Sequence, residues 1–256
     1  MPLSSDHCLC LRKFEYSETS QILTLFSRTH GLFRAIAKGA HRRTKAGASK
    51  FDGGVDLLDL GQAVFTHDPS RELSTLTEWH LLNGHLCLRS DLRPLYLSQY
   101  SAELVSSMME EHDPHPDLFD RLRHLLEELP TSRMEESFLC FQLDLLRETG
   151  YLPELSACVG CGAELDHLRA HSHFSLSRGG VTCPTCTSGD RYAIDPRLVR
   201  LLQQLLRLPR SNGHPQRLPK LTRHQTDPLN ALLCRHIQHT LSRPMRLVRY
   251  VLGEKA

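Results

Sequence analysis

Two close cysteine pairs constrain this 256-residue chain more than any other feature of its sequence. Cys158 and Cys161 form the first pair, Cys183 and Cys186 form the second, and 21 residues separate the pairs. Each pair places two thiolates on one tight turn, and two such turns complete a tetrahedron around zinc. Because four thiolates leave no position for water or substrate, we predict a structural zinc site. Two unlinked redox pairs or reduced cysteines are the alternative reading.

The remaining cysteines and the hydropathy pattern place the chain in a reducing compartment. The five remaining cysteines lie scattered among apolar neighbours, and in a reducing compartment we expect such cysteines to be small buried residues. They are Cys8, Cys10, Cys87, Cys140 and Cys234. No apolar run reaches the roughly 18–20 residues that a membrane span needs. The first residues lack the pattern of a secretory signal. We expect a cytoplasmic protein without a membrane partner.

Motifs of the common zinc and nucleophile enzymes are missing from the sequence. No His-x-Glu stands beside the cysteine pairs, as zinc deaminases require. His-Glu-x-x-His, Gly-x-Ser-x-Gly and a Walker-type phosphate loop are also missing. We therefore predict a protein that is not an enzyme. A zinc-dependent nucleic-acid hydrolase stays an alternative, and it would need an open metal position and a nearby carboxylate.

The first part of the chain has the pattern of a small β-barrel. Short apolar runs predict strands at residues 7–14, 21–26, 32–37, 55–66 and 73–79. Strict alternation in the first run places Cys8, Cys10 and Arg12 on one face, with Leu9, Leu11 and Lys13 on the other. Five short strands in this length indicate an OB-fold, a five-stranded Greek-key barrel, over residues 1–79.

From residue 80 the apolar period changes to that of helices. We predict helices near residues 81–88, 96–108 and 118–129. A fourth is capped by Thr131 or Ser132, with Glu135 three residues after Ser132, and ends at Gly150. Two more begin at Asp195-Pro196 and Asp227-Pro228. The chain is thus expected to be α+β and multidomain, with a helical domain over residues 80–256 and a zinc-binding insert at about 155–190.

Positive charge is concentrated in two regions. Residues 1–50 carry nine Lys and Arg against three acids, and residues 187–256 carry thirteen against four. Cations beside an exposed groove attract phosphates and release condensed counterions. We therefore predict a nucleic-acid surface on and beside one mobile loop, made of Arg34, Lys38, Arg42, Arg43, Lys45 and Lys50. A merely solvated loop is the alternative.

Two further sets of residues each allow more than one interpretation. Four aromatic residues near the loop either stack bases or fill the barrel core: Phe14, Tyr16, Phe33 and Phe51. The C-terminal cations either extend the nucleic-acid surface, dock an acidic protein tail, or balance acidic helices: Arg197, Arg200, Arg207, Arg210, Arg217, Lys220 and Arg223.

Two stretches of the sequence resemble one known family. Residues 11–40, with Tyr16-Ser17-Glu18-Thr19-Ser20, Leu23-Thr24-Leu25-Phe26-Ser27 and Ala37-Lys38-Gly39-Ala40, resemble the opening of RecO proteins. Residues 148–162, which run from Glu148-Thr149-Gly150-Tyr151-Leu152-Pro153 into Cys158-Val159-Gly160-Cys161-Gly162, resemble the family's entry to its zinc-binding segment. Residues 49–54 depart from the apolar-Gln-Pro stretch of many members.

The resemblance implies a DNA repair and recombination mediator. Such a protein binds single- and double-stranded DNA, anneals complementary strands, and acts with RecR to load RecA onto strands coated by single-strand-binding protein. The alternative is a zinc-stabilised adaptor that grips the acidic tail of a partner protein.

Overall fold

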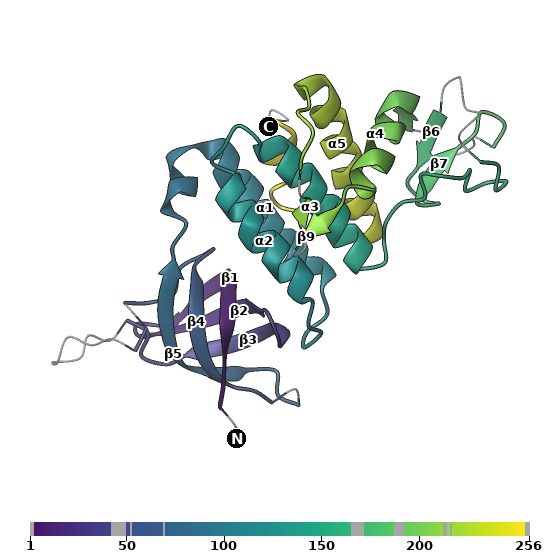
Figure 1. Cartoon of the computed structure of the whole chain (residues 1–256). Coiled ribbons are helices and arrows are strands. Elements are labelled where there is room, and N and C mark those ends of the chain that lie inside the picture. Colours follow the sequence, from purple (N-terminus) through teal and green to yellow (C-terminus); the bar gives the residue numbers. More distant parts are fainter. Residues whose placement is uncertain are drawn as a thin grey trace. The chain divides into compact units, whose positions relative to one another are not determined.

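The computed structural model describes residues 3–41, 50–51, 53–68, 70–164, 172–186, 192–211, 214–215 and 217–253. The chain forms two compact units, Met1–Ser132 and Arg133–Ala256. The first contains a barrel with two α-helices, and the second contains the cysteine segment among the other helices (Figure 1).

Five strands close the barrel in the first unit. They are β1 (Leu3–Ser17), β2 (Ser20–Ser27), β3 (Gly31–Ala37), β4 (Leu60–Thr66) and β5 (Ser74–Asn83). Their order around the barrel is β1-β2-β3-β5-β4, and β4 pairs again with β1. Only β3 and β5 run parallel among these pairs. This topology is that of the OB-fold, which confirms the predicted fold class.

A β-bulge in β1 changes which residues point outward. Cys8 and Cys10 lie in the barrel core, as predicted. The register of β1 on β2 then shifts between Cys10 and Arg12, because Cys10 pairs with Leu25 whereas Arg12 pairs with Thr24. Strict alternation had placed Arg12 with the two cysteines, and that prediction is wrong: Arg12 is exposed.

The end of β5 also differs from the prediction. Leu81 and Leu82 belong to the strand and not to a helix, because β5 continues its ladder with β4 through Asn83. A short 3-10 helix, η1 (Leu86–Ser90), follows. Gly61 of β4 makes the pairing possible, since a Cβ there would lie 2.3 Å from the ring of Trp79. Residues 55–59 precede β4 as a loop.

Two helices complete the first unit, α1 (Leu92–Met108) and α2 (Pro116–Glu128). Both agree with the predicted periodicity. The ring of Phe119 on α2 lies 5.6 Å from that of Phe26 on β2, so α2 covers part of the sheet's outer face. The domain boundary expected after residue 79 stays a prediction.

The second unit holds α3 (Met134–Glu148), α4 (Pro196–Leu206), α5 (Arg223–Thr240) and α6 (Val248–Leu252). A three-stranded sheet lies between α3 and α4 in sequence: β6 (Ser172–Ser175), β7 (Gly180–Thr182) and β8 (Tyr192–Ile194). Strands β9 (Arg210–Ser211) and β10 (His214–Pro215) pair before α5.

The predicted starts of these helices are right for α4 and wrong for α3 and α5. Asp195 caps α4, and its carboxylate accepts a 2.8 Å hydrogen bond from the Arg197 amide. The N-cap of α3 is Arg133 and not Ser132. α5 begins four residues before Asp227, with Thr222 as its N-cap, and it carries Pro228 inside its first turns.

Candidate metal centre and nucleic-acid interface

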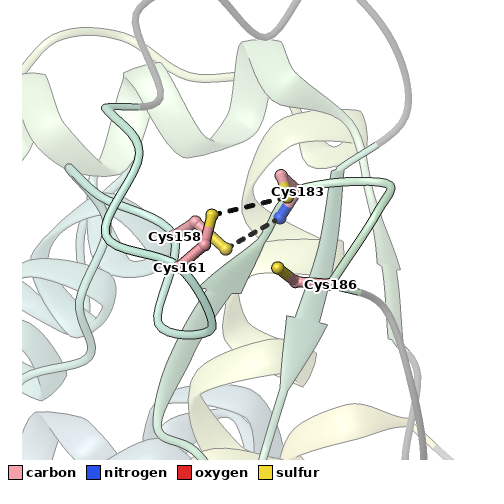
Figure 2. Close-up of side chains that lie close together, drawn as sticks. All are labelled: Cys158, Cys161, Cys183 and Cys186. Carbon is pink, nitrogen blue, oxygen red and sulfur yellow. Dashed lines mark hydrogen bonds between the residues drawn. The ribbon is translucent and has the colours of Figure 1, made fainter.

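The four predicted cysteines come together in the second unit. The Sγ atoms of Cys158, Cys161, Cys183 and Cys186 all lie within 4.8 Å of one another. One pair lies on a turn between α3 and β6, and the other lies on the turn after β7. Figure 2 shows the four sulfur atoms around a common centre. The predicted clustering is confirmed.

Backbone hydrogen bonds shape both turns. The amide of Gly162 donates to the Cys158 carbonyl at 2.8 Å, and the amide of Cys186 donates to the Cys183 carbonyl at 3.1 Å. A Cβ at Gly160 would lie 2.7 Å from the Cβ of Cys186, so only glycine allows the two turns to approach this closely. The sequence therefore builds the cluster from two local turns, and the Val159 amide ties the first turn to β7 by a 3.0 Å hydrogen bond to the Val181 carbonyl.

The surroundings of the thiols favour a thiolate at two positions. A hydrogen bond with the Thr185 hydroxyl lowers the pKa of Cys183 to about 6. Burial raises the pKa of Cys158, but amide donors from Cys183 and Gly160 outweigh burial and lower the pKa overall. The hydrogen bond with Cys183 raises the pKa of Cys186 to about 12. The cluster thus shares protons that a bound cation would displace.

The geometry fits a tetrahedral metal. Zinc bound by thiolates at about 2.3 Å has sulfur atoms about 3.8 Å apart at the corners of its tetrahedron. Cys161 Sγ and Cys183 Sγ lie 3.9 Å apart. His173 lies on β6 and is not part of the cluster, and His171 falls outside the described residues. Four cysteines can therefore hold one metal without a histidine and without an open position for substrate.

Three of the six predicted nucleic-acid residues lie in the described part of the barrel. Arg34 points outward from β3, Lys38 follows the end of β3, and Lys50 precedes β4, and all are exposed. The other three, Arg42, Arg43 and Lys45, fall outside the described residues. Whether the six form one surface stays a prediction.

A groove on the outer face of the barrel contains one of these residues. It has a volume of about 390 Å³, and its walls come from β1, β2, β3 and the end of α1. The residues that line it are Arg12, Lys13, Phe14, Ile22, Thr24, Arg34, Ser106 and Glu111. Arg34 was predicted from the sequence as a nucleic-acid residue, and Phe14 was a candidate aromatic residue. Arg12 was not predicted, because the bulge that turns it outward leaves no local signal in the sequence.

The candidate aromatic residues divide into two groups. Phe33 and Phe51 are 0% and 4% exposed and belong to the barrel core, so they cannot stack a ligand. Phe14 and Tyr16 on β1 are 65% and 61% exposed. The alternative that each aromatic residue fills the core is therefore right for two of them and wrong for the other two.

Most of the C-terminal cations are exposed, and Arg210 is an exception. Its guanidinium donates to the Asp144 carboxylate at 2.5 Å and to the Leu206 carbonyl at 3.3 Å, so it is held within the second unit. The exposed ones are Arg197, Arg200, Arg207, Arg217, Lys220 and Arg223. Within the described ranges, none of the helices combines the length and the apolar character needed to cross a membrane.

The chain combines an OB-fold barrel, a helical region and a cluster of four cysteines that is compatible with a metal site. It is therefore a multidomain α+β protein of the OB-fold class. Family models narrow this class. Residues 1–85 match the model "Recombination protein O N terminal", and residues 89–247 match "Recombination protein O C terminal". The chain belongs to the recombination protein O (RecO) family, whose members act in DNA repair and recombination.

Curated relatives agree with this assignment. The DNA repair protein RecO of Rhodopirellula baltica is 32% identical over 179 residues, which are 70% of this chain and 65% of that protein. RecO of Anaeromyxobacter sp. strain K is 30% identical over 77% of this chain and 76% of its own length. RecO of Roseiflexus sp. is 28% identical over 95% of this chain and 83% of its own length.

Proposed function

We propose that this chain is a mediator that binds single- and double-stranded DNA, anneals complementary strands, and acts with RecR to load RecA onto strands coated by single-strand-binding protein. It makes and breaks no covalent bond. Cations on the barrel offset the repulsion between two phosphate backbones, so complementary strands can pair on one surface. DNA binding would also place the protein at the nucleoid.

The observation that carries this proposal is that Arg34 is free to bind a phosphate. Its guanidinium is exposed and has no hydrogen bond or ion pair within the part of the chain that the structure describes. Lys13, in contrast, already forms an ion pair with Asp56 at 2.8 Å. An exposed cation without an internal partner can bind a phosphate at no cost in broken ion pairs.

A strand-annealing assay with and without single-strand-binding protein, at two salt concentrations, tests the proposal. We expect annealing by the wild-type chain that weakens as salt increases. The double variant Arg34→Gln/Lys38→Gln should bind single strands with a salt slope smaller by about 1.4, because each phosphate contact contributes about 0.7 on single strands. Arg71→Gln, an exposed arginine paired with Asp68, is the matched control.

The basic loop adds a second test. Neutralising Arg42, Arg43 and Lys45 together should weaken binding about equally for all sequences, because phosphate contacts carry no base information. Binding that this triple variant leaves unchanged would remove the loop from the proposed surface. Displacement of DNA by an acidic peptide would show that a protein tail competes for the same cations, as the adaptor alternative requires.

We infer that the metal of the four-cysteine centre is zinc and that its role is structural. The 3.9 Å sulfur separation and the all-thiolate set support zinc. When bound, the metal would fix the turn of Cys158 to the turn of Cys183 and so hold the segment's fold.

A further inference from the structure

We propose that the groove on β1, β2 and β3 is a subsite for unpaired bases, in which Phe14 stacks a base while Arg12 and Arg34 hold the adjoining phosphates. This inference rests on the proposed DNA-binding function and deepens it. It names the residues that would let the chain distinguish a single strand from a duplex.

Strand register places two rows of side chains across this face. In one row, Thr24 of β2 lies between its partners Arg12 on β1 and Arg34 on β3. Directly opposed residues on neighbouring strands have Cβ atoms about 4.5–5.5 Å apart and point to the same side. The first row is therefore cationic at both ends.

The second row is apolar. Ile22 of β2 lies between its partners Phe14 on β1 and Ile36 on β3. Phe14 is 65% exposed, although burial of such a side chain is favourable. A single exposed aromatic residue is ordinary. Here, however, it lines a groove together with two arginines, and that combination is what single-strand sites use.

The charges of the groove determine where a backbone can lie. Arg34 has no partner among the described side chains, and the contact of Arg12 is a 3.5 Å hydrogen bond to the Ser107 hydroxyl. Glu111 lines the groove too, and its bridge to Leu32 places it near the β3 end of the cationic row, where its exposed carboxylate opposes phosphate. The two guanidinium groups nevertheless leave this row with a net positive charge. A nucleic-acid backbone would therefore follow the row of Arg12 and Arg34 and leave its bases on Phe14 and Ile22.

Such a site accepts an unpaired base and rejects a paired one. A duplex hides the faces of its bases in its own stack, so it offers Phe14 no surface to contact. The groove volume of about 390 Å³ is near the lower end of the roughly 300–1,000 Å³ that small-ligand sites have. Stacking adds about 1–3 kcal/mol per base to single-strand binding and nothing to duplex binding.

The test compares Phe14→Ala with Leu3→Ala, an equally exposed apolar residue at the other end of β1. We expect Phe14→Ala to weaken binding of a mixed-sequence single strand about 5- to 150-fold, which is the stacking contribution converted at about 1.4 kcal/mol per tenfold. Duplex binding should change less than twofold. Leu3→Ala should change neither, and Phe14→Trp should retain single-strand binding.

A second readout reports the stacking itself. A 2-aminopurine in the single strand should lose fluorescence on binding to the wild-type chain and to Phe14→Trp, and much less on binding to Phe14→Leu, which keeps an apolar side chain without a ring. If Phe14→Ala lost the same affinity for single strands and for duplexes, or lost none for either, the inference would be overturned while DNA binding stayed intact. Wild-type protein that binds neither form would instead refute the proposed function.

Discussion

Asp56 shows how one carboxylate sorts the cations of the barrel. It accepts hydrogen bonds from Lys13 and from Arg89, each at 2.8 Å. Burial raises the pKa of Asp56, but these two partners outweigh burial and lower the pKa to about 2. Asp56 is therefore ionised at any physiological pH, and it holds Lys13 and Arg89 in ion pairs. Among the residues that the structure describes, Arg12 and Arg34 are cations on the outer face of the strands without a carboxylate partner.

Another residue-scale contact closes the base of the basic loop. His41 shares a 3.0 Å contact with the Glu15 carboxylate and a 3.2 Å contact with the Gly53 carbonyl, on either side of the loop in sequence. The bond to Glu15 raises the pKa of His41 above 6.5, and the bond to His41 lowers the pKa of Glu15 below 4.5. The charged pair therefore ties residue 41 to residue 15, and the protonated imidazole can also donate to the Gly53 carbonyl beyond the loop.

We predict that Glu15→Gln destabilises the barrel more at pH 5.5 than at pH 8.5. A raised histidine pKa contributes stability below the unfolded value and loses it as the pH rises through the folded value. A lowered glutamate pKa contributes stability above the unfolded value, so the pair stabilises the barrel fully between about pH 4.5 and 6.5. The side chains of Glu15 and His41 are 51% and 35% exposed, so we expect the loss of unfolding free energy to be at most about 1 kcal/mol.

Urea unfolding followed by the fluorescence of Trp79, the sole tryptophan and part of the barrel core, measures this difference. Glu72→Gln, an exposed glutamate in the loop between β4 and β5, is the control and should show no dependence on pH. A Glu15→Gln effect of the same size at both pH values would mean that charge does not hold the loop base.

At the scale of elements, local sequence signals predicted some boundaries and misled at others. The Asp195-Pro196 signal correctly predicted the start of α4, because Asp195 supplies the cap and Pro196 is the first helical residue. At α5 the same signal, Asp227-Pro228, lies inside the helix. The true start has a competing signal, Thr222 with Gln225 three residues later, and nothing in the local sequence ranks one above the other.

We predict that Gln225→Ala destabilises the second unit by about 0.5–1 kcal/mol, because it removes half of the capping box of α5. The Gln225 side-chain carbonyl accepts hydrogen bonds from the Thr222 amide at 2.9 Å and from the Thr222 hydroxyl at 3.1 Å. His224→Ala in the same turn is the control, since His224 is exposed. Thermal unfolding followed by far-UV circular dichroism measures both. A neutral Gln225→Ala would show that α5 depends on packing alone.

The groove illustrates what sequence reasoning cannot reach. The cysteine cluster was predictable because two short turns carry all of its ligands. The outward position of Arg12 and Phe14 depends instead on a bulge, which is stabilised by backbone hydrogen bonds to residues far along the chain. The Cys10 amide donates to the Asp59 carbonyl at 3.0 Å, and the Cys10 carbonyl accepts from the Leu58 amide at 2.8 Å. Those contacts exist only once the barrel has closed, so alternation along β1 gave the wrong face.

For the whole molecule, the two compact units allow metal and barrel to be monitored separately. The four cysteines lie in the second unit and Trp79 lies in the first. Removing a structural metal should therefore change the far-UV circular dichroism, to which both units contribute, more than the fluorescence of Trp79. The free energy of metal binding is folding free energy for the segment that supplies the ligands.

We accordingly predict that the purified chain holds one zinc ion. A chelator or the substitution Cys161→Ser should lower the midpoint of thermal unfolding measured by circular dichroism. The unfolding transition measured by Trp79 fluorescence should stay nearly unchanged. Zinc binding to zinc-finger peptides contributes about 10–16 kcal/mol, which sets the upper limit of the loss. Cys87→Ser, an exposed cysteine outside the cluster, should keep both the zinc and the midpoint. If Cys161→Ser kept its metal and its midpoint, the four sulfurs would not be the ligands. If both transitions fell together, the two units would unfold as one body, and the metal would stabilise the barrel as well as the segment that binds it.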